Sequence, residues 1–282
     1  MPKFGALAYT WVGTWNKETG QKAIEKAAKA GLDLIEIPLV NADRFNAELT
    51  CRQLAEAGIS GVATLALPKE AHLPTNPKRA TEFLKLAIDK VEQMGGTHLS
   101  GVLYGHAGTL VGRPPTQEER DTCARVLAEI ASYADEKRIT LAIEPINRYE
   151  TYLFNVVEDA LALIEKVGAP NLKLHVDTYH MNIDEHGFYQ PTKLAGDRLI
   201  YVHASDSDRG TVGEGNVRWD DFFRALAEIN YEGPLVLESF SSVVPEMIAV
   251  SCMWRPSMMG IDEMVSRSLQ FLKAKATNYG LN

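Results

Sequence analysis

The chain has 282 residues, and 45% of them are hydrophobic, which is sufficient for a large buried core. Its 29 basic and 37 acidic residues give a formal net charge of −8 at pH 7. This charge argues against a nucleic-acid partner, which requires a concentrated positive face. The three cysteines (Cys51, Cys123 and Cys252) have no CxxC spacing, which disfavours a disulfide framework and a thiolate zinc site.

Residues 1–13 lack the apolar core and the cleavage site of a signal peptide. The sequence also has no run of about 18 apolar residues that could cross a bilayer. We therefore expect a cytoplasmic protein with no membrane partner. Because no Gly/Ser-rich, Pro-rich or highly charged stretch resembles a linker, residues 1–282 are expected to form one domain.

Short aliphatic runs alternate with longer amphipathic segments along the chain, which is the pattern of strands that alternate with helices. The expected strands are residues 4–9, 32–37, 60–67, 97–104, 140–145, 172–177, 199–204 and 234–239. Helical patterns include residues 17–31, 47–58, 116–137, 219–230 and a last helix near 260–276. Gly31, Gly58 and Gly168 follow helical patterns and are expected to end those helices in the left-handed conformation.

Eight strand–helix repeats predict an α/β fold, and in particular a closed parallel (β/α)8 TIM barrel with an outer ring of helices. A doubly wound open sheet is the alternative. It would need a Gly-rich phosphate turn after an early strand, and residues 9–15 (YTWVGTW) do not form one. In a barrel, functional side chains come from the carboxyl ends of the strands, so the candidates are found at those ends.

Successive side chains of a strand face opposite sides of the sheet, and this separates inward from outward residues in the last four strands. Leu141 and Ile143 share the face that suits the surrounding helices, so Glu144 is expected to face the interior. The same alternation in the next three strands directs one metal-competent side chain inward at each carboxyl end. The four predicted inward side chains are Glu144, Asp177, His203 and Glu238.

Three carboxylates a few Å apart would repel one another by about 4 kcal/mol per pair at an effective dielectric constant near 20. The sum approaches the whole stability of a typical domain, on the order of 10 kcal/mol, so protons or a cation must neutralise them. Three oxygen donors, one imidazole and room for further oxygens suit Mn²⁺, with Mg²⁺ or Co²⁺ as alternatives. We therefore predict an open metal site at this end of the barrel.

Four segments follow one another at these strand ends: IEPINRYE (143–150), HVDTYHMNIDE (175–185), VHASDSDRG (202–210) and LVLESFSS (235–242). Together they resemble the ketose 3-epimerase family, which includes the D-tagatose, D-allulose (D-psicose) and L-ribulose 3-epimerases. This family lies within the xylose isomerase-like TIM barrel superfamily. The resemblance extends over essentially the whole chain.

The resemblance implies epimerisation at C3 of a free ketose through a cis-enediolate, with Glu144 and Glu238 as acid and base. It implies a Mn²⁺-type ion, and its ligands are the set that strand alternation also selects: Glu144, Asp177, His203 and Glu238. The resemblance further implies a homodimer or a homotetramer.

The resemblance also assigns substrate binding to His180, Arg209 and Glu150. His180 and Arg209 would hold the substrate oxygens near C1 and C2. Glu150 would form a hydrogen bond with either the substrate or His180. Because His180 comes three residues after Asp177, we expect it in the loop that follows the strand.

Trp15, in the first loop, is either a hydrophobic wall for the tail of the sugar or ordinary packing. Glu36, inward at the end of the second strand, is expected to orient a substrate contact. Residues 9–15 and 105–110 differ from the best-known tagatose and allulose enzymes, which leaves the preferred ketose open. The apolar, Met-rich stretch 247–260 is either part of an interface or a cover over the active site.

An aldose–ketose isomerase on the same barrel is the nearest alternative function, because it would use the same metal and an enediolate. A metal-dependent endonuclease of the same superfamily would need more inward histidines and a basic face. The chain has seven histidines and a net charge of −8, which disfavours that function. A sugar-binding barrel without turnover is the non-enzymatic alternative. Such a protein could lack a catalytic carboxylate, but both Glu144 and Glu238 are present.

Overall fold

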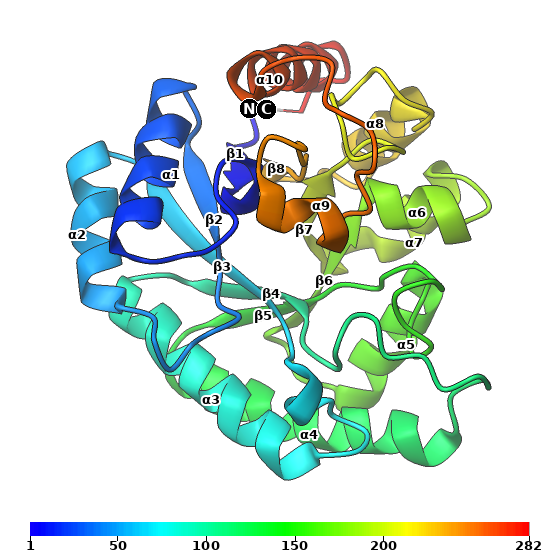
Figure 1. Ribbon diagram of the computed structural model, residues 1–282. Helices are drawn as coiled ribbons and strands as arrows, with labels where there is room; N and C mark the ends of the chain where they lie inside the picture. Colours follow the sequence, from blue (N-terminus) through cyan, green and yellow to red (C-terminus); the bar gives the residue numbers. More distant parts are fainter. Residues whose placement is uncertain (282) are drawn as a thin grey trace.

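Figure 1 shows the computed structural model, which describes residues 1–281. The strands form a closed parallel barrel in chain order, and the last strand pairs back with the first. They are β1 (Phe4–Leu7), β2 (Leu34–Pro38), β3 (Ser60–Ala66), β4 (His98–Val102), β5 (Thr140–Ile143), β6 (Leu172–Asp177), β7 (Leu199–Ala204) and β8 (Leu235–Leu237). The predicted (β/α)8 TIM barrel is confirmed, and each expected strand overlaps an observed one.

Helices surround the barrel, and most of them pack against the next one around the ring (Figure 1). They are α1 (Lys17–Lys29), α2 (Ala47–Ala57), α3 (Pro77–Met94), α4 (Gln117–Glu136), α5 (Val157–Val167), α6 (Thr178–Asp184), α7 (Tyr189–Ala195), α8 (Trp219–Glu228), α9 (Pro245–Val250) and α10 (Ile261–Asn278). Gly58 and Gly168 end α2 and α5 in the left-handed conformation, and Gly31 has a φ of 73° just after α1, as expected. In the described part of the chain, no helix has the length and apolar content that a membrane span requires.

The hydrophobic core lies on both faces of the strands. Outward residues such as Leu141 and Leu172 belong to the large core cluster that includes the helices. On the inner faces, Leu34, Tyr201 and Val236 form a smaller apolar cluster. Because the inner space is filled in this way, polar side chains are directed to the carboxyl ends of the strands.

A shift of register between β6 and β7 decides which side chains of β7 face inward. Leu174 pairs with Leu199, but the next residue, His175, pairs with Tyr201, so Ile200 is an extra residue in the ladder. Ile200 packs against the inner cluster. Alternation counted from Val202, an outward core residue, directs Tyr201 and His203 inward as predicted, whereas alternation counted from Leu199 would direct them outward. The bulge at Ile200 reconciles the two outward residues and keeps Tyr201 and His203 on the inner face.

Thiol labelling tests the packing of the helical ring. Cys123 is buried on α4, and burial raises the pKa of its thiol to about 12, whereas Cys51 and Cys252 are exposed. We expect a thiol reagent near pH 8 to label Cys51 and Cys252 in the folded protein and Cys123 only after unfolding, because the thiolate is the reactive form. Mass spectrometry of the labelled peptides identifies the sites. Labelling of native Cys123 as fast as Cys51 would contradict the packing of α4.

Candidate active site

A cavity of about 380 Å³ opens at the carboxyl ends of the strands. Its volume lies within the range of about 300–1,000 Å³ that small-molecule sites occupy, and its place is the one that barrel enzymes use. It brings together most of the predicted site residues. Those that line it are Glu36, Glu144, Glu150, His180, His203, Arg209 and Glu238.

His203 is the imidazole around which the carboxylates gather. Its Nε2 lies 2.8 Å from Oε2 of Glu36, and the Tyr201 hydroxyl donates to the same oxygen at 2.5 Å. We assign one ring proton to Nε2 from these contacts, and Nδ1 is buried without a hydrogen-bond partner. Burial lowers the pKa of His203, but the charges of Glu36 and Glu238 outweigh it and raise the pKa well above its usual value, so the ring by itself is cationic. A metal ion bound at Nδ1 would displace the proton of that nitrogen. Nδ1 lies 3.6 Å from Oε1 of Glu144 and 3.7 Å from Oε2 of Glu238. A histidine oriented by a carboxylate in this way presents its other nitrogen to a metal ion.

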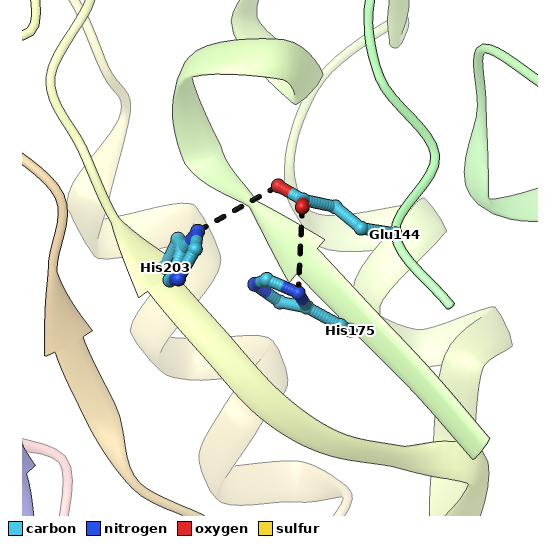
Figure 2. A group of neighbouring side chains, drawn as sticks. All are labelled: Glu144, His175 and His203. Carbon is cyan, nitrogen blue, oxygen red and sulfur yellow. Dashed lines mark ion pairs between the residues drawn. The ribbon is translucent and has the colours of Figure 1, made fainter. Parts of the chain in front are cut away.

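Glu144 lies between two imidazoles, with one oxygen directed to His203 and the other to His175 (Figure 2). Nδ1 of His175 is 3.6 Å from Oε2 of Glu144, but it is also 2.8 Å from the Ser100 hydroxyl. Burial, and then the charge of His203, hold the pKa of His175 well below its usual value. His175 is therefore a neutral ring whose nitrogen on the Glu144 side is already paired with Ser100, whereas His203 has a free one.

Arg209 forms ion pairs with two of the predicted metal ligands. Its Nη1 lies 3.2 Å from Oδ2 of Asp177 and also contacts Oε2 of Glu238. Burial, and then the charge of Glu238, raise the pKa of Asp177 well above its usual value. Burial acts in the same direction on Glu238, but the charges of Arg209 and His203 hold its pKa below the usual range. The guanidinium therefore offsets part of the carboxylate repulsion that the sequence predicts.

Asp177 ends β6 and also caps α6, because its Oδ1 accepts a hydrogen bond from the Tyr179 N–H at 2.8 Å. His180 therefore lies in the first turn of a short helix, and its expected place in a loop is wrong. The physical reason is that aspartate is a strong N-cap residue, so the carboxylate that ends the strand also starts the helix. The turn brings Nε2 of His180 to 3.6 Å from Oδ2 of Asp177 and 3.9 Å from Oε1 of Glu144.

Asn147 is a residue of this site that sequence reasoning missed. Its backbone N–H and its side-chain amide lie 3.2 and 2.8 Å from Nδ1 of His180, and the amide also donates to Glu150 at 2.9 Å. Glu150 thus reaches His180 through Asn147. Since Nδ1 accepts these bonds, we assign the proton of His180 to Nε2, which faces Asp177 and Glu144 and also lies 3.3 Å from Nη2 of Arg209. The available signal was a polar residue between Glu144 and Glu150 in the segment IEPINRYE.

Arg209 is held by its backbone and by two aromatic rings. Its φ of 56° lies in the left-handed region, which is unfavourable for a side chain with a β-carbon, so the surrounding loop must maintain it. The guanidinium carbon lies 3.9 Å from the ring centre of Tyr179 and 5.3 Å from that of Phe240. The carboxylate of Asp206 organises the loop by accepting hydrogen bonds from the backbone N–H groups of Ser207, Gly213 and Val217 and from the indole N–H of Trp219.

The residues present fit a divalent metal ion. Three overlapping groups of side chains have ligand atoms within 4.8 Å of one another: Glu144 with His175 and His203, Glu144 with Asp177 and His180, and Asp177 with His203 and Glu238. The four predicted ligands all occur in these groups. Carboxylate oxygens around the free Nδ1 of His203 form the mixed oxygen and nitrogen set that ions such as Mn²⁺ accept. The structure therefore contains a buried Glu/His/Asp site that could hold a metal ion.

Glu36 lies inward near the end of β2 as expected, and one other predicted site residue lies elsewhere. Glu36 is fully buried, and its Oε2 contacts His203 and Tyr201, so it supports an imidazole. Its expected role in orienting a substrate contact stays a prediction. Trp15 lines a second, adjoining cavity of about 520 Å³. The indole lies against α1, where a β-carbon on Gly20 would approach the ring to 3.0 Å.

The segment after β8 covers part of the first cavity, because α9, which lies near β7 and β8 in Figure 1, contributes residues to its lining. Glu246, Met247 and Val250 of α9 line the cavity. Glu246 lies close to the first loop, because a β-carbon on Gly13 would come within 2.4 Å of the β-carbon of Glu246. Residues at the start of the stretch 247–260 therefore act as a cover, and a role of this stretch in an interface stays a prediction.

Comparison with known proteins agrees with this geometry. The family model described as xylose isomerase-like TIM barrel matches residues 24–275. A closed barrel with polar side chains gathered at the carboxyl ends of its strands is the architecture of that class. The chain is a xylose isomerase-like TIM barrel protein.

Individual proteins similar to this chain identify a more specific family within this class. The chain is 37% identical to an L-ribulose 3-epimerase of Methylomonas sp. (strain DH-1), with 97% of each chain covered. It is 34% identical to a ketose 3-epimerase of Arthrobacter globiformis, over 98% of this chain and 97% of the relative. A crystal structure of D-allulose 3-epimerase from Methylomonas sp. in complex with D-allulose matches with a TM-score of 0.93 and 37% identity over 97% of each chain. The chain belongs to the ketose 3-epimerase family, which confirms the predicted resemblance.

Substitution of Glu36 tests its effect on His203. Glu36→Gln keeps the size of the side chain but removes its charge, and it is expected to weaken Mn²⁺ binding by about 10- to 100-fold, the usual effect of losing a partner that orients a metal-binding histidine. Tyr201→Phe is the milder control, because it removes only the hydroxyl that donates to Glu36. Competition with a fluorescent chelator measures both affinities. Unchanged affinity in Glu36→Gln would contradict this role.

Substitution of Asp206 tests the support of Arg209. Asp206→Ala leaves the buried N–H groups of Val217 and Trp219 without an acceptor. It is expected to lower the free energy of unfolding by at least about 2 kcal/mol, because each unsatisfied buried donor costs about 1–3 kcal/mol. Asp208→Ala is the matched control, because Asp208 is exposed and accepts from the Gly210 N–H, so its effect should stay within about 0.5 kcal/mol. Urea denaturation measures both variants, and equal effects would show that Asp206 does not organise the loop.

Proposed function

We propose that the chain catalyses metal-dependent epimerisation at C3 of free ketoses. The observation that carries the proposal is the approach of Glu144 and Glu238, from the ends of two different strands, to the same nitrogen of His203 at 3.6 and 3.7 Å. Inversion at a carbon needs one group that removes the proton and another that returns it from the opposite face, and two carboxylates on either side of a metal site suit this task. The relatives named as L-ribulose and ketose 3-epimerases support the same reaction.

The proton at C3 of a ketose is acidic because C3 is adjacent to the C2 carbonyl, and its removal gives a cis-enediolate. A divalent ion held by Glu144, Asp177, His203 and Glu238 would supply Lewis-acid stabilisation of the negative charge that develops on the substrate oxygens. We propose Mn²⁺, with Mg²⁺ or Co²⁺ as alternatives, because the donors are three carboxylates and one imidazole. Glu144 and Glu238 then exchange the C3 proton with the two faces of the intermediate.

His180, Arg209 and Glu150 are proposed to hold the C1–C2 end of the ketose. Burial, and then the charge of Arg209, hold the pKa of His180 well below its usual value, so the ring is neutral. Because Asn147 occupies Nδ1, Nε2 is the nitrogen that faces the cavity, 3.3 Å from Nη2 of Arg209, and a substrate oxygen there would accept from both groups. Arg209 adds cationic donors that the Tyr179 and Phe240 rings hold in place.

The wall of the cavity on the side of β1 to β4 is mostly apolar. It includes Leu7, Tyr9, Pro38, Val40, Leu65, Ala66, Val102 and Ala107. An apolar wall discriminates weakly between substrates that differ by a hydroxyl group, whereas a site built to bond a hydroxyl discriminates strongly. This wall supports action on several ketoses of the L-ribulose, D-allulose, D-fructose and D-tagatose type.

Residues 1–282 would act as one barrel domain in a cytoplasmic homodimer or homotetramer. Size-exclusion chromatography with light scattering measures the oligomeric state.

The nearest alternative is an aldose–ketose isomerase, which would move a proton between C1 and C2 with the same residues. A ketose incubated with the enzyme in D₂O should take up deuterium at C3, because the proton removed there exchanges with solvent before its return. Proton NMR locates the label. Deuterium at C1 without any at C3 would overturn the epimerase proposal in favour of the isomerase.

Removal of either acid–base group should abolish most of the turnover. Glu144→Gln and Glu238→Gln are each expected to lower kcat by at least about 10²-fold, the lower end of what general acid–base groups contribute. Circular dichroism shows whether the variants fold. Glu150→Gln is the matched control, because Glu150 is proposed to bind substrate, and its effect should appear mainly in KM. Near-normal turnover in Glu144→Gln or Glu238→Gln would contradict the assigned roles.

Metal removal tests the predicted ion directly. Elemental analysis should find about one divalent ion per chain, and treatment with a chelator should abolish activity until Mn²⁺ is added back. Removal should also lower Tm, since an ion that binds the folded state stabilises it by mass action. Full activity in metal-free protein would contradict the proposal.

A further inference from the structure

A second cavity adjoins the first on the side of β1 and β2. It has a volume of about 520 Å³ and is lined by the segments that follow β1 and β2, including the starts of α1 and α2. Tyr9, Gly13, Pro38 and Val40 line both cavities, so the two meet along this rim. Its volume alone is typical of a small-molecule site, about 300–1,000 Å³. We call this space the annex cavity, and its lining residues are Tyr9, Gly13, Thr14, Trp15, Asn16, Lys17, Pro38, Val40, Asn41, Arg44, Phe45, Asn46, Leu49, Thr50 and Gln53.

We propose that the annex cavity binds a glycosyl group attached to the far end of the ketose, so that the enzyme epimerises 6-O-glycosyl ketoses as well as free ones. This inference rests on the proposed function, because it takes the C1–C2 end of the substrate to lie at His180 and Arg209. It extends that function to a larger class of substrate.

The direction of the substrate follows from the order of the strands. The groups proposed to bind the C1–C2 end follow β5, β6 and β7, and the strands close in chain order, so β2 lies opposite β6 in the ring. A ketose with C3 at Glu144 and Glu238 and with C1 toward β6 directs C4 to C6 toward β2. Pro38 and Val40, at and after the end of β2, form part of the rim that opens to the annex cavity.

The lining of the annex cavity matches the chemistry of a sugar ring, which has apolar C–H faces and a rim of hydroxyl groups. Trp15 contributes a rigid aromatic surface, because its ring is packed against Gly20 of α1. Phe45 and Leu49 add apolar surface. Exposed polar side chains at the edge, Asn41 and Arg44 among them, offer hydrogen-bond donors to hydroxyl groups.

A phosphate group is the competing occupant, because α1 and α2 both begin at this cavity. The caps of these helices argue against it. Oδ1 of Asn16 already accepts the N–H groups of Glu18 and Thr19, and Oδ1 of Asn46 accepts the N–H of Leu49. The caps therefore occupy three of the first-turn donors, and Glu18 and Glu48 add negative charge to the first turns of α1 and α2. An uncharged glycosyl group fits these observations better.

Turnover of isomaltulose, in which glucose is linked to O6 of D-fructose, tests the inference against free D-fructose and D-fructose 6-phosphate. We expect kcat/KM for isomaltulose to lie within about tenfold of that for D-fructose, with deuterium from D₂O incorporated at C3 of the ketose unit. Turnover of free ketoses without turnover of isomaltulose, or a preference for the phosphate over isomaltulose, would overturn the inference and leave the proposed function intact. Failure with every ketose, free L-ribulose included, would contradict the proposed function and the inference together.

Two substitutions that fill the annex cavity locate the binding site. Asn41→Trp fills the annex cavity from an exposed turn, and Leu49→Trp fills it from the first turn of α2. Each variant should lower kcat/KM for isomaltulose by at least about tenfold, while the turnover of D-fructose is unchanged. Asp43→Trp is the matched control, because Asp43 is exposed and lines a neighbouring surface cavity instead. Unchanged isomaltulose turnover in both filled variants, or equal loss for the two substrates, would overturn the inference. A changed oligomeric state in Asn41→Trp with isomaltulose turnover retained would assign the annex cavity to a second copy of the chain.

Discussion

Repulsion among buried carboxylates is the constraint to which the open end of this barrel is adapted. Glu144, Asp177 and Glu238 lie close together, and the positive charges of Arg209 and His203 offset part of their repulsion. Burial makes each uncompensated charge costly, so the neighbours of these groups must hold fixed orientations. The same cluster of carboxylates, unfavourable when no cation is bound, is suited to binding a divalent cation. The proposed chemistry depends on that cation.

The fold and the set of converging side chains could be predicted because both follow from local patterns. Eight aliphatic runs define the strands, and a parallel barrel brings their carboxyl ends to one opening whatever the loops do. Alternation then selects Glu144 and Glu238 as inward residues without any knowledge of their partners. The structure brings these residues together as that reasoning requires, and their individual catalytic roles stay predictions.

The features that sequence reasoning missed depend on contacts between distant segments, and no periodic pattern of hydrophobic residues reveals such contacts. Asn147 joins Glu150, in its own loop, to His180 in α6, and Glu36 on β2 supports His203 on β7 across the barrel. Trp15 is directed away from the first cavity by its packing on Gly20. In each case the residue type allows several partners, and the three-dimensional path of the chain determines which one is present.

The extra residue in β7 limits the insertions and deletions that this strand can tolerate. Because Ile200 shifts the ladder by one position, the inward direction of His203 depends on a count of residues as well as on the identity of any one of them. Loss or gain of one residue in β7 would turn the imidazole into the helical layer and leave the carboxylates without it. Point substitutions and loop exchanges on the side of β1 to β4 carry no such penalty. Diversity of substrates is therefore expected to arise in those loops, while the length of β7 is kept.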